Sequence, residues 1–243
     1  MPTDDTASRV AVVTGASSGI GAATARALAA GGYRVALLAR RVDRITALAD
    51  ELANGSIAIA ADVTDRDSLV AAADRVRDEL GGADVLVNNA GVMLLGPFSS
   101  DQRDDHRRMI EVNLLGALTA TEVFLDQLKD GGGDIVNISS VAGRSARAGN
   151  GVYAATKWGI NGWSESLRQE LAPDVRVTLI EPGVVDTELP GHITHAQTRE
   201  GVQALYDQAQ VSAGDIAEII AFVLSRPRHL AIHQVLVRPA GQL

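Results

Sequence analysis

The sequence contains no cysteine among its 243 residues, which excludes disulfide bonds and thiolate metal sites and is compatible with a cytoplasmic protein. Aromatic residues are also scarce, at 3%, although the hydrophobic share is 46%. The core must therefore be built from Ala, Val, Leu and Ile. That mixture favours alanine-rich helices packed on strands of branched aliphatic residues.

Positively charged residues are fewer than negatively charged ones. The sequence has 22 Lys and Arg and 30 Asp and Glu, which gives a net charge of -8. This balance argues against nucleic acid or an anionic membrane as the main partner. No apolar run is long enough to cross a bilayer, and the opening residues MPTDDTASRV lack the basic and apolar regions of a signal peptide. We therefore expect a soluble, cytoplasmic protein with neither a nucleic-acid nor a membrane partner.

Short apolar runs alternate with longer alanine-rich segments along the whole chain. The predicted strands are residues 9–15, 33–39, 56–63, 83–91, 133–140, 175–183 and 233–239. The predicted helices are residues 19–32, 43–53, 67–80, 104–128, 153–171 and 215–224. This alternation predicts one α/β domain, residues 1–243, with a doubly wound seven-stranded parallel sheet of the Rossmann type and helices on both faces.

One segment interrupts this alternation. Residues 187–210, TELPGHITHAQTREGVQALYDQAQ, are polar and poorly periodic, and they separate the sixth strand from the last helix. Long insertions in compact domains are often lids or binding loops. We predict a substrate-binding lid here, the alternative being a solvated excursion without function.

A glycine-rich loop follows the first predicted strand and opens the first helix. In TGASSGIG, residues 14–21, Gly15 permits a tight turn, Gly19 lets the backbone approach a pyrophosphate, and Gly21 lets helix and strand pack closely. The free N–H groups of the following helix end suit an anion. The loop predicts a dinucleotide site rather than an ordinary glycine turn. Its candidate cofactor contacts are Gly15, Ser17, Ser18, Gly19, Ile20 and Gly21.

The end of the second strand indicates which dinucleotide is bound. An NAD site places an acidic residue there, whereas this sequence has Ala39 followed by Arg40 and Arg41. A carboxylate would repel the 2′-phosphate of NADP, and a guanidinium can pair with it. We therefore predict NADP(H) as the cofactor. The alternative is that the two arginines only cap a helix or face solvent.

A tyrosine and a lysine stand four positions apart in GVYAATKWGI, residues 151–160. On a helix this spacing puts Tyr153 and Lys157 on one face, one turn apart. A free tyrosine, with a pKa of about 10, holds its proton too tightly to act well as a base at neutral pH. A nearby ammonium group would lower that pKa. The alternative is a buried tyrosine that anchors the helix while the lysine stem passes it.

Together with five further motifs, the glycine-rich loop and the Tyr153–Lys157 segment resemble the short-chain dehydrogenase/reductase family, in its single-domain branch with the TGxxxGxG spacing. The matching segments, in the family's order, are TGASSGIG, ADVTD, NNAG, EVNLLG, IVNISS, YAATK and EPGVVDTEL. Each is weak alone, but their order along nearly the whole chain is specific. The segment DTELPGHITH is most similar to a group of bacterial NADP-dependent reductases that includes clavulanate dehydrogenase.

The resemblance implies a role for each of four catalytic positions. Tyr153 matches the general acid/base, and Lys157 matches the residue that lowers the pKa of that tyrosine and holds the nicotinamide ribose. Ser140 matches the hydroxyl donor to the substrate carbonyl; Ser139 points to the other side of an extended strand and is the weaker choice. Asn113 matches the helix asparagine that supports a proton relay through water.

The resemblance also implies further cofactor contacts, to the adenine, the adenosine ribose and the nicotinamide carboxamide in turn. They are Asp62 and Val63 for the adenine; Asn89, Ala90 and Gly91 for the ribose; and Pro182, Gly183, Val185 and Thr187 for the carboxamide.

These features lead to an expected function. The chain should be an NADP(H)-dependent carbonyl reductase, an oxidoreductase that converts an aldehyde or ketone to an alcohol. Oxidation of a hydroxy acid or alcohol is one alternative, and a non-catalytic NADP(H) sensor is another. The intact set of four catalytic residues counts against a sensor. The resemblance further implies a small-molecule partner and assembly as a homodimer or homotetramer.

Four other residues have roles that the sequence leaves open. His192 and His195 are three apart, but no carboxylate or third histidine stands at a useful offset, so we predict no metal site. Arg144 and Arg147 follow the strand that carries Ser140. They could meet a substrate carboxylate, or simply be solvated in a loop.

Overall fold

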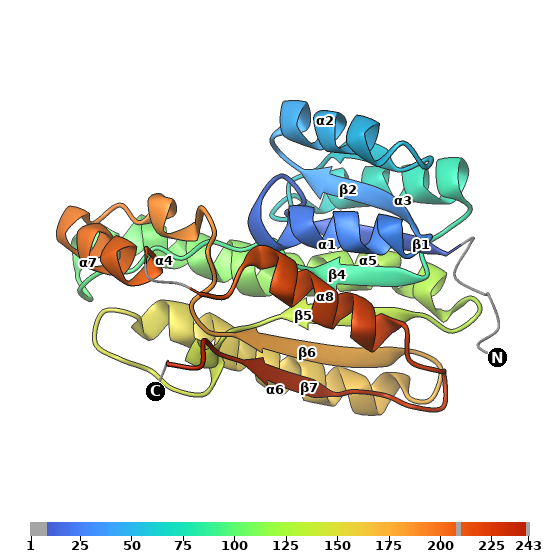
Figure 1. Cartoon of the computed structure of the whole chain (residues 1–243). Helices are drawn as coiled ribbons and strands as arrows, with labels where there is room; N and C mark the ends of the chain where they lie inside the picture. Colours follow the sequence, from blue (N-terminus) through green and yellow to red (C-terminus); the bar gives the residue numbers. More distant parts are fainter. Residues whose placement is uncertain (1–8, 208–209, 242–243) are drawn as a thin grey trace.

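The computed structural model describes residues 9–207 and 210–241, and its strands and helices alternate as the sequence predicts (Figure 1). Residues 1–8, 242–243 and the lid positions 208–209 lie outside the described residues, and so does most of the segment on which the expected absence of a signal peptide rests. The strands are β1 (Val10–Thr14), β2 (Arg34–Ala39), β3 (Ile57–Ala60), β4 (Val85–Asn88), β5 (Asp134–Ile138), β6 (Arg176–Pro182) and β7 (Gln234–Val237).

All seven strands form one parallel sheet in the order β3-β2-β1-β4-β5-β6-β7. Strands β1, β4, β5 and β6 are buried along their whole length, because helices cover both faces; this explains their continuous apolar sequences. The order reverses direction between β1 and β4. In open α/β sheets such a switch point leaves a crevice outside the carboxyl ends of the strands.

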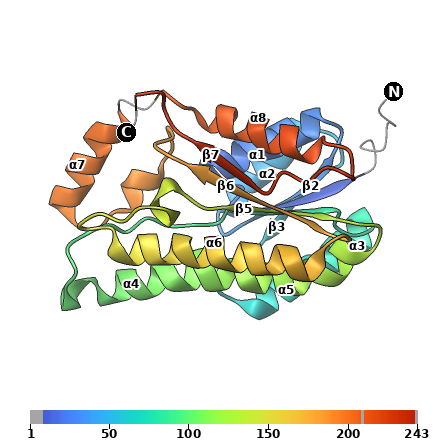
Figure 2. The same ribbon diagram turned by 90° about the horizontal axis from the view of Figure 1, so that it is seen from below.

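Two hydrophobic cores lie on opposite faces of the sheet, which confirms the doubly wound architecture (Figure 2). On one face the helices are α1 (Gly19–Ala30), α2 (Val42–Leu52) and α8 (Ala213–Leu224). On the other they are α3 (Arg66–Leu80), α5 (Gly116–Lys129) and α6 (Gly151–Leu171). Phe124 of α5 is the largest side chain that is fully buried.

The long helix predicted at residues 104–128 is present but is not regular throughout. It consists of α4 (Arg103–Ile110), a π-helical turn η2 (Glu111–Leu115) and α5. The π turn contains Asn113, whose side chain is buried. Such turns are frequent at functional sites, since they redirect part of a helix without ending it.

The segment predicted as a lid contains two short helices. These are the 3-10 helix η4 (Leu189–His192) and α7 (Ala196–Tyr206), which lie beyond the carboxyl ends of the strands (Figure 1). Helix α7 has no clear pattern in the sequence, because none of its side chains is fully buried and no apolar stripe is needed. Its first turn is capped by His195, whose Nδ1 accepts a hydrogen bond from the Thr198 backbone.

Among the described residues, the model has no helix that is both long enough and apolar enough to span a membrane.

Candidate active site

A cavity of about 740 Å³ opens at the carboxyl ends of the strands, below the predicted lid. Of the predicted cofactor contacts, all but Gly21 line it. Three of the four predicted catalytic residues line it as well, and Asn113 is the exception. The sequence motifs, although far apart in the chain, thus converge on one site.

Two glycines of the loop after β1 lie where a side chain would not fit. Gly15 has a φ of +67°, and a Cβ there would lie 2.8 Å from the Cα of Ala90. A Cβ on Gly21 would lie 2.5 Å from both the Gly15 carbonyl oxygen and the Asn89 side-chain nitrogen. Gly21 therefore serves the packing of the loop, which is why it does not line the cavity.

The first turn of α1 is open to an anionic ligand. Within the described part of the chain, no side chain caps this helix end and its first turn contains no acidic residue. Its unpaired backbone N–H groups and positive dipole end face the cavity beside Ser17 and Ser18. This donor set fits a pyrophosphate.

The arginines after β2 form a basic cluster next to this loop. Arg41 donates from Nε to Ser17 Oγ at 3.0 Å and from Nη2 to Ser18 Oγ at 2.6 Å. Arg40 Nη1 lies 3.9 Å from Asp62 Oδ2. The cluster also includes Arg44, which the sequence analysis missed; its position one helical turn after Arg41 was the available signal.

Tyr153 and Lys157 occupy one face of α6, as predicted, and both are buried. Lys157 Nζ donates to the Ile138 carbonyl oxygen at 2.8 Å and lies 5.8 Å from the centre of the Tyr153 ring. Burial raises the pKa of Tyr153 to about 12, against a smaller opposing effect of its hydrogen bond with Ser140. Burial lowers the pKa of Lys157 to about 8.

The pKa of Tyr153 therefore moves in the opposite direction to our expectation that Lys157 lowers it. The reason is desolvation, which disfavours the charged form of both groups. At neutral pH the phenol is protonated, so in this structure Tyr153 is an acid that can donate a proton.

The two adjacent serines after β5 face different partners. Ser139 Oγ donates to Asn161 Oδ1 at 2.6 Å, whereas Ser140 forms a hydrogen bond with Tyr153. Ser140 Oγ also accepts a hydrogen bond from the Ala142 backbone at 3.1 Å. The structure therefore places Ser140, rather than Ser139, beside the phenol.

Asn113 is held by hydrogen bonds of its own. Its Oδ1 accepts from the Val92 N–H at 2.7 Å, and its Nδ2 donates to the Val92 carbonyl at 2.8 Å and to Thr156 Oγ1 at 3.3 Å. The amide thus joins the π turn to the segment after β4 and to the helix that carries Tyr153. This arrangement positions the site, and the proton relay expected of Asn113 stays a prediction.

The outer part of the cavity has an apolar wall that the sequence analysis did not identify. It is lined by Met93, Leu95, Val202, Leu205 and Tyr206. The pKa of Tyr206 is raised by burial and by the nearby Tyr153, and its hydroxyl lies 3.9 Å from the Met93 sulfur. One tyrosine at the end of a polar segment gave no signal in the sequence.

The structure distinguishes between the two loop arginines, Arg144 and Arg147, whose roles the sequence left open. Arg144 Nε lies 2.8 Å from both carboxylate oxygens of the buried Glu181, so it is already occupied by a carboxylate of the protein. Arg147 lines the cavity and is exposed. Of the pair, only Arg147 is placed to meet a substrate.

His192 and His195 also lie in different surroundings. His195 caps α7 and contacts Thr198, whereas His192 lines the cavity. Within residues 9–207 and 210–241, no group of three His, Asp or Glu side chains is arranged to hold a metal ion.

Residues 9–198, which carry the glycine loop, the two serines and the Tyr153–Lys157 pair, match the family model described as short chain dehydrogenase. The chain belongs to the short-chain dehydrogenase/reductase family. It is therefore an oxidoreductase by family, and the Rossmann-type sheet described above is the fold of that family.

Relatives from this family match nearly the whole chain. An uncharacterized oxidoreductase of Mycobacterium tuberculosis is 44% identical over 246 residues, which span 100% of this chain and 95% of the relative. An alcohol dehydrogenase of Thermococcus sibiricus complexed with 5-hydroxy-NADP is 33% identical, with a TM-score of 0.87 and coverage of 97% of this chain and 98% of that one. The closed form of a serine dehydrogenase complexed with NADP+ is 31% identical, with a TM-score of 0.90 and coverage of 96% of both chains. None of these three is a clavulanate dehydrogenase, so that narrower resemblance stays a prediction.

Proposed function

We propose that this protein is an NADP(H)-dependent reductase that converts an aldehyde or ketone to an alcohol. The observation that carries the proposal is the buried Tyr153, which lines the cavity together with Ser140 and Lys157. Two hydroxyl groups at one point can polarise a carbonyl oxygen and then supply the proton that the oxygen needs as an alcohol.

The residues around the cavity fit NADP(H). The open N-terminus of α1 suits the pyrophosphate, and the guanidinium groups of Arg40 and Arg41 suit the 2′-phosphate, since β2 ends at Ala39 without a carboxylate. The similar alcohol and serine dehydrogenases were solved with NADP-type cofactors, which supports the same choice here. When bound, the cofactor supplies the hydride and, in its oxidised form, a positive ring charge that favours the phenolate.

The chain's own residues provide the rest of the chemistry. Ser140 and Tyr153 would donate hydrogen bonds to the carbonyl oxygen and stabilise its developing negative charge. Tyr153 would then release its phenolic proton to that oxygen. Lys157, which remains mostly protonated at neutral pH with a pKa of about 8, would stabilise the phenolate left behind.

The apolar wall of the outer cavity favours a small or medium carbonyl compound with an apolar body, covered by residues 187–210 as a lid. The reverse reaction, oxidation of a hydroxy acid or alcohol, is the second candidate. The exposed Arg147 on the cavity wall suits the carboxylate of such a hydroxy acid, and equally that of the keto acid formed from it. Assembly as a homodimer or homotetramer is a proposal that rests on the family resemblance, and a cytoplasmic location is one that rests on the sequence features described above.

The test is NADPH consumption by the purified protein across a panel of aldehydes, ketones and keto acids, with NADH in parallel and Tyr153→Phe as the matched variant. Wild type should oxidise NADPH with one class of carbonyl compound. The variant should still bind NADPH, seen by its fluorescence, but turn over roughly 10²- to 10⁴-fold more slowly, because the proton donor is gone. Equal rates for the two proteins would refute Tyr153 as the acid. NADPH binding with no turnover on any compound would favour a sensor.

A further inference from the structure

A carboxylate from the lid occupies the arginines that follow β2. Glu188 lies immediately before η4, yet its Oε2 accepts from Arg41 Nη1 at 3.1 Å, and its Oε1 accepts from Arg44 Nη1 at 3.0 Å. The residues in these two pairs are 147 and 144 positions apart in the chain. The contact therefore joins the beginning of the lid to the end of β2, across the mouth of the cavity.

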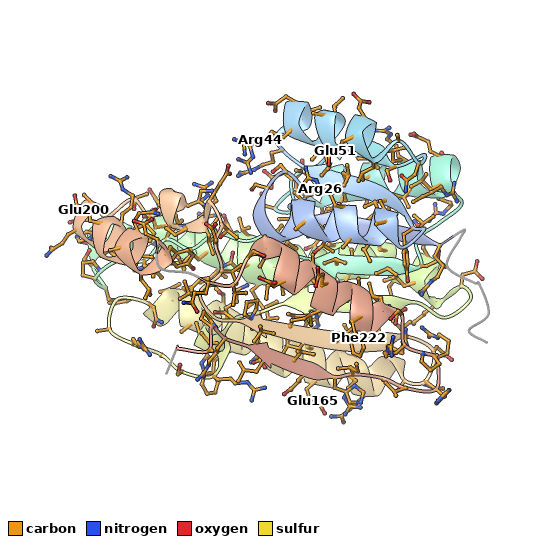
Figure 3. The ribbon with its side chains drawn as sticks, in the orientation of Figure 1. Arg26, Arg44, Glu51, Glu165, Glu200 and Phe222 are labelled. Carbon is orange, nitrogen blue, oxygen red and sulfur yellow. The ribbon has the colours of Figure 1, made fainter. Side chains whose placement is uncertain are left out.

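The orientation of Arg41 makes this contact specific. Its Nε and Nη2 are held by Ser17 and Ser18, so the guanidinium is fixed and Nη1 is directed at the carboxylate of Glu188. Arg44 approaches from the beginning of α2, the end of that helix nearest to the lid (Figure 3). A carboxylate bound by two guanidinium groups occupies the same kind of donor fork that a phosphate monoester would use.

We propose that Glu188 is a specificity-determining residue that competes with the 2′-phosphate of NADP(H) for Arg41, the member of this pair of arginines that also lines the cavity. This inference rests on the proposed use of NADP(H). A phosphate monoester carries about 1.5 to 2 negative charges at neutral pH and prefers the same guanidinium groups as a carboxylate. Two anions at one pair of arginines repel each other, so binding of the phosphate displaces Glu188.

The competition acts on only one of the two nicotinamide cofactors. Hydrogen bonds from Arg44 and Arg41 lower the pKa of Glu188, so its carboxylate is ionised at neutral pH and has to be displaced as an anion. NAD(H) has no phosphate at the 2′ position and leaves the contact in place.

A purely mechanical role for the same contact makes the opposite prediction. Thr187 lies close to the glycine loop, with its Cγ2 3.3 Å from where a Cβ on Gly19 would be. If the contacts of Glu188 only held its segment against the glycine loop, they would retain either cofactor. Their loss would then weaken the binding of NADPH and NADH alike. The two roles are thus distinguished by the sign of the change.

The test compares Glu188→Gln with wild type by fluorescence titration of NADPH and NADH, with adenosine 2′,5′-bisphosphate as a displacing probe. We expect Kd for NADPH and for the bisphosphate to fall roughly three- to tenfold, and Kd for NADH to change less than about twofold. The gain should shrink between 50 and 500 mM salt, because exposed charges are screened.

The matched control is Glu51→Gln, which removes the same charge from an equally exposed ion pair. Glu51 of α2 binds Arg26 of α1 at 2.7 Å (Figure 3). The side chains of Glu51 and Glu188 are both 53% exposed. It should leave the binding of both cofactors unchanged. A gain in NADPH affinity of the same size in Glu51→Gln would mean that net charge, rather than competition at the arginines, is responsible.

Failure of this inference differs from failure of the proposed function. If wild type prefers NADPH and Glu188→Gln binds it no more tightly, or binds both cofactors more weakly, the competition is refuted alone. If wild type binds NADH as well as NADPH, the assignment of NADP(H) is itself wrong. Both results come from binding and need no substrate.

Discussion

Tyr153 and Lys157 show how burial divides two neighbouring groups into different protonation states. Burial raises the pKa of the phenol to about 12 and lowers that of the ammonium to about 8. Both shifts favour the neutral form, but only the lysine is still charged at pH 7. The folded protein therefore keeps the charged ammonium group of Lys157 buried in the site at neutral pH.

Because burial of this charge is unfavourable, we expect Lys157→Met to increase the free energy of unfolding at pH 7. Unfolded lysine has a pKa near 10.4, so between about pH 8 and 10.4 the unfolded state binds more protons and wild-type stability rises with pH. Below pH 8 the full cost of the buried charge is present, and methionine removes it. We expect the free energy of unfolding to rise by about 2–3 kcal/mol at pH 7, with a smaller difference at pH 9.5, while turnover is lost.

Urea unfolding of both proteins at pH 7 and pH 9.5 measures this difference. A less stable variant at pH 7 would show that the hydrogen bond from Lys157 to the Ile138 carbonyl contributes more than the burial of the charge costs.

We expect the substitution Arg40→Ala to weaken the use of NADPH and to leave the use of NADH nearly unchanged. Arg40 lines the cavity at the end of β2, and its guanidinium should pair with the 2′-phosphate. We expect KM for NADPH to rise roughly tenfold and KM for NADH to stay within about twofold. Steady-state kinetics with both cofactors would measure the change, with Arg75→Ala on the exposed face of α3 as the control. An unchanged preference for NADPH over NADH would contradict the role.

At this scale, the sequence predicts residues whose relation is local or follows from a strand end. The spacing of Tyr153 and Lys157 on a helix is an example, as is the position of Arg40 after β2. It does not predict Glu188, because the meeting of its carboxylate with Arg41 depends on the path of a segment 147 residues away. Tyr206 was missed for the same reason.

At the scale of the elements, ionic contacts connect the strands at their amino ends, the end of the sheet opposite the cavity. Asp134, the buried first residue of β5, contacts Arg176 of β6 at 2.6 Å, Arg9 before β1 at 2.8 Å and Arg228 before β7 at 3.3 Å. One carboxylate thus connects three strands and a loop at their amino ends, far from the cavity.

Asp134→Asn should therefore destabilise the sheet without changing the active site. Removing one partner of a buried ion pair leaves uncompensated charge, here on Arg176 above all, and costs about 3–5 kcal/mol. The ion pair of the exposed Glu165 with Arg168 on α6 provides the comparison, and Glu165→Gln should cost much less (Figure 3). Chemical denaturation measures both. Similar losses in the two variants would contradict the importance of burial at Asp134.

The elements themselves were predicted to within a few residues where they contact the core. Helix α3 illustrates this: its apolar face packs on the sheet and Asp65 caps its start. The π turn at Asn113 could not be predicted, because it accompanies hydrogen bonds to Val92, which lies 21 residues away. Helix α7 was missed because a helix on the surface of a cavity needs no buried stripe.

The whole molecule combines both halves of the sheet around one cavity. Alternating strands and helices predicted the parallel, doubly wound architecture, since right-handed crossovers leave few other arrangements. The alternation does not by itself fix the strand order, which comes from long-range pairing such as that of β1 with β4. The place where the order reverses is the place where the site lies.

Because both halves line the cavity, binding of the cofactor should stabilise the whole fold. At a free concentration 100 times Kd, a ligand that binds only the folded state adds about 2.7 kcal/mol. For a chain of this size we expect NADPH to raise Tm by roughly 5–10 °C. Thermal unfolding at equal concentrations of NADPH and NADH would check this, and the larger rise should be with NADPH. Equal shifts would contradict a 2′-phosphate site.

The separation between the Asp134 contacts at one end of the sheet and the predicted lid at the other affects how such a protein can change over evolution. Helix α7 has no fully buried side chain, so its sequence is scarcely constrained by the packing of the core. New lids can accumulate substitutions, or be exchanged between relatives, while the scaffold beneath them keeps its stability. Substrate choice can thus diverge faster than the chemistry.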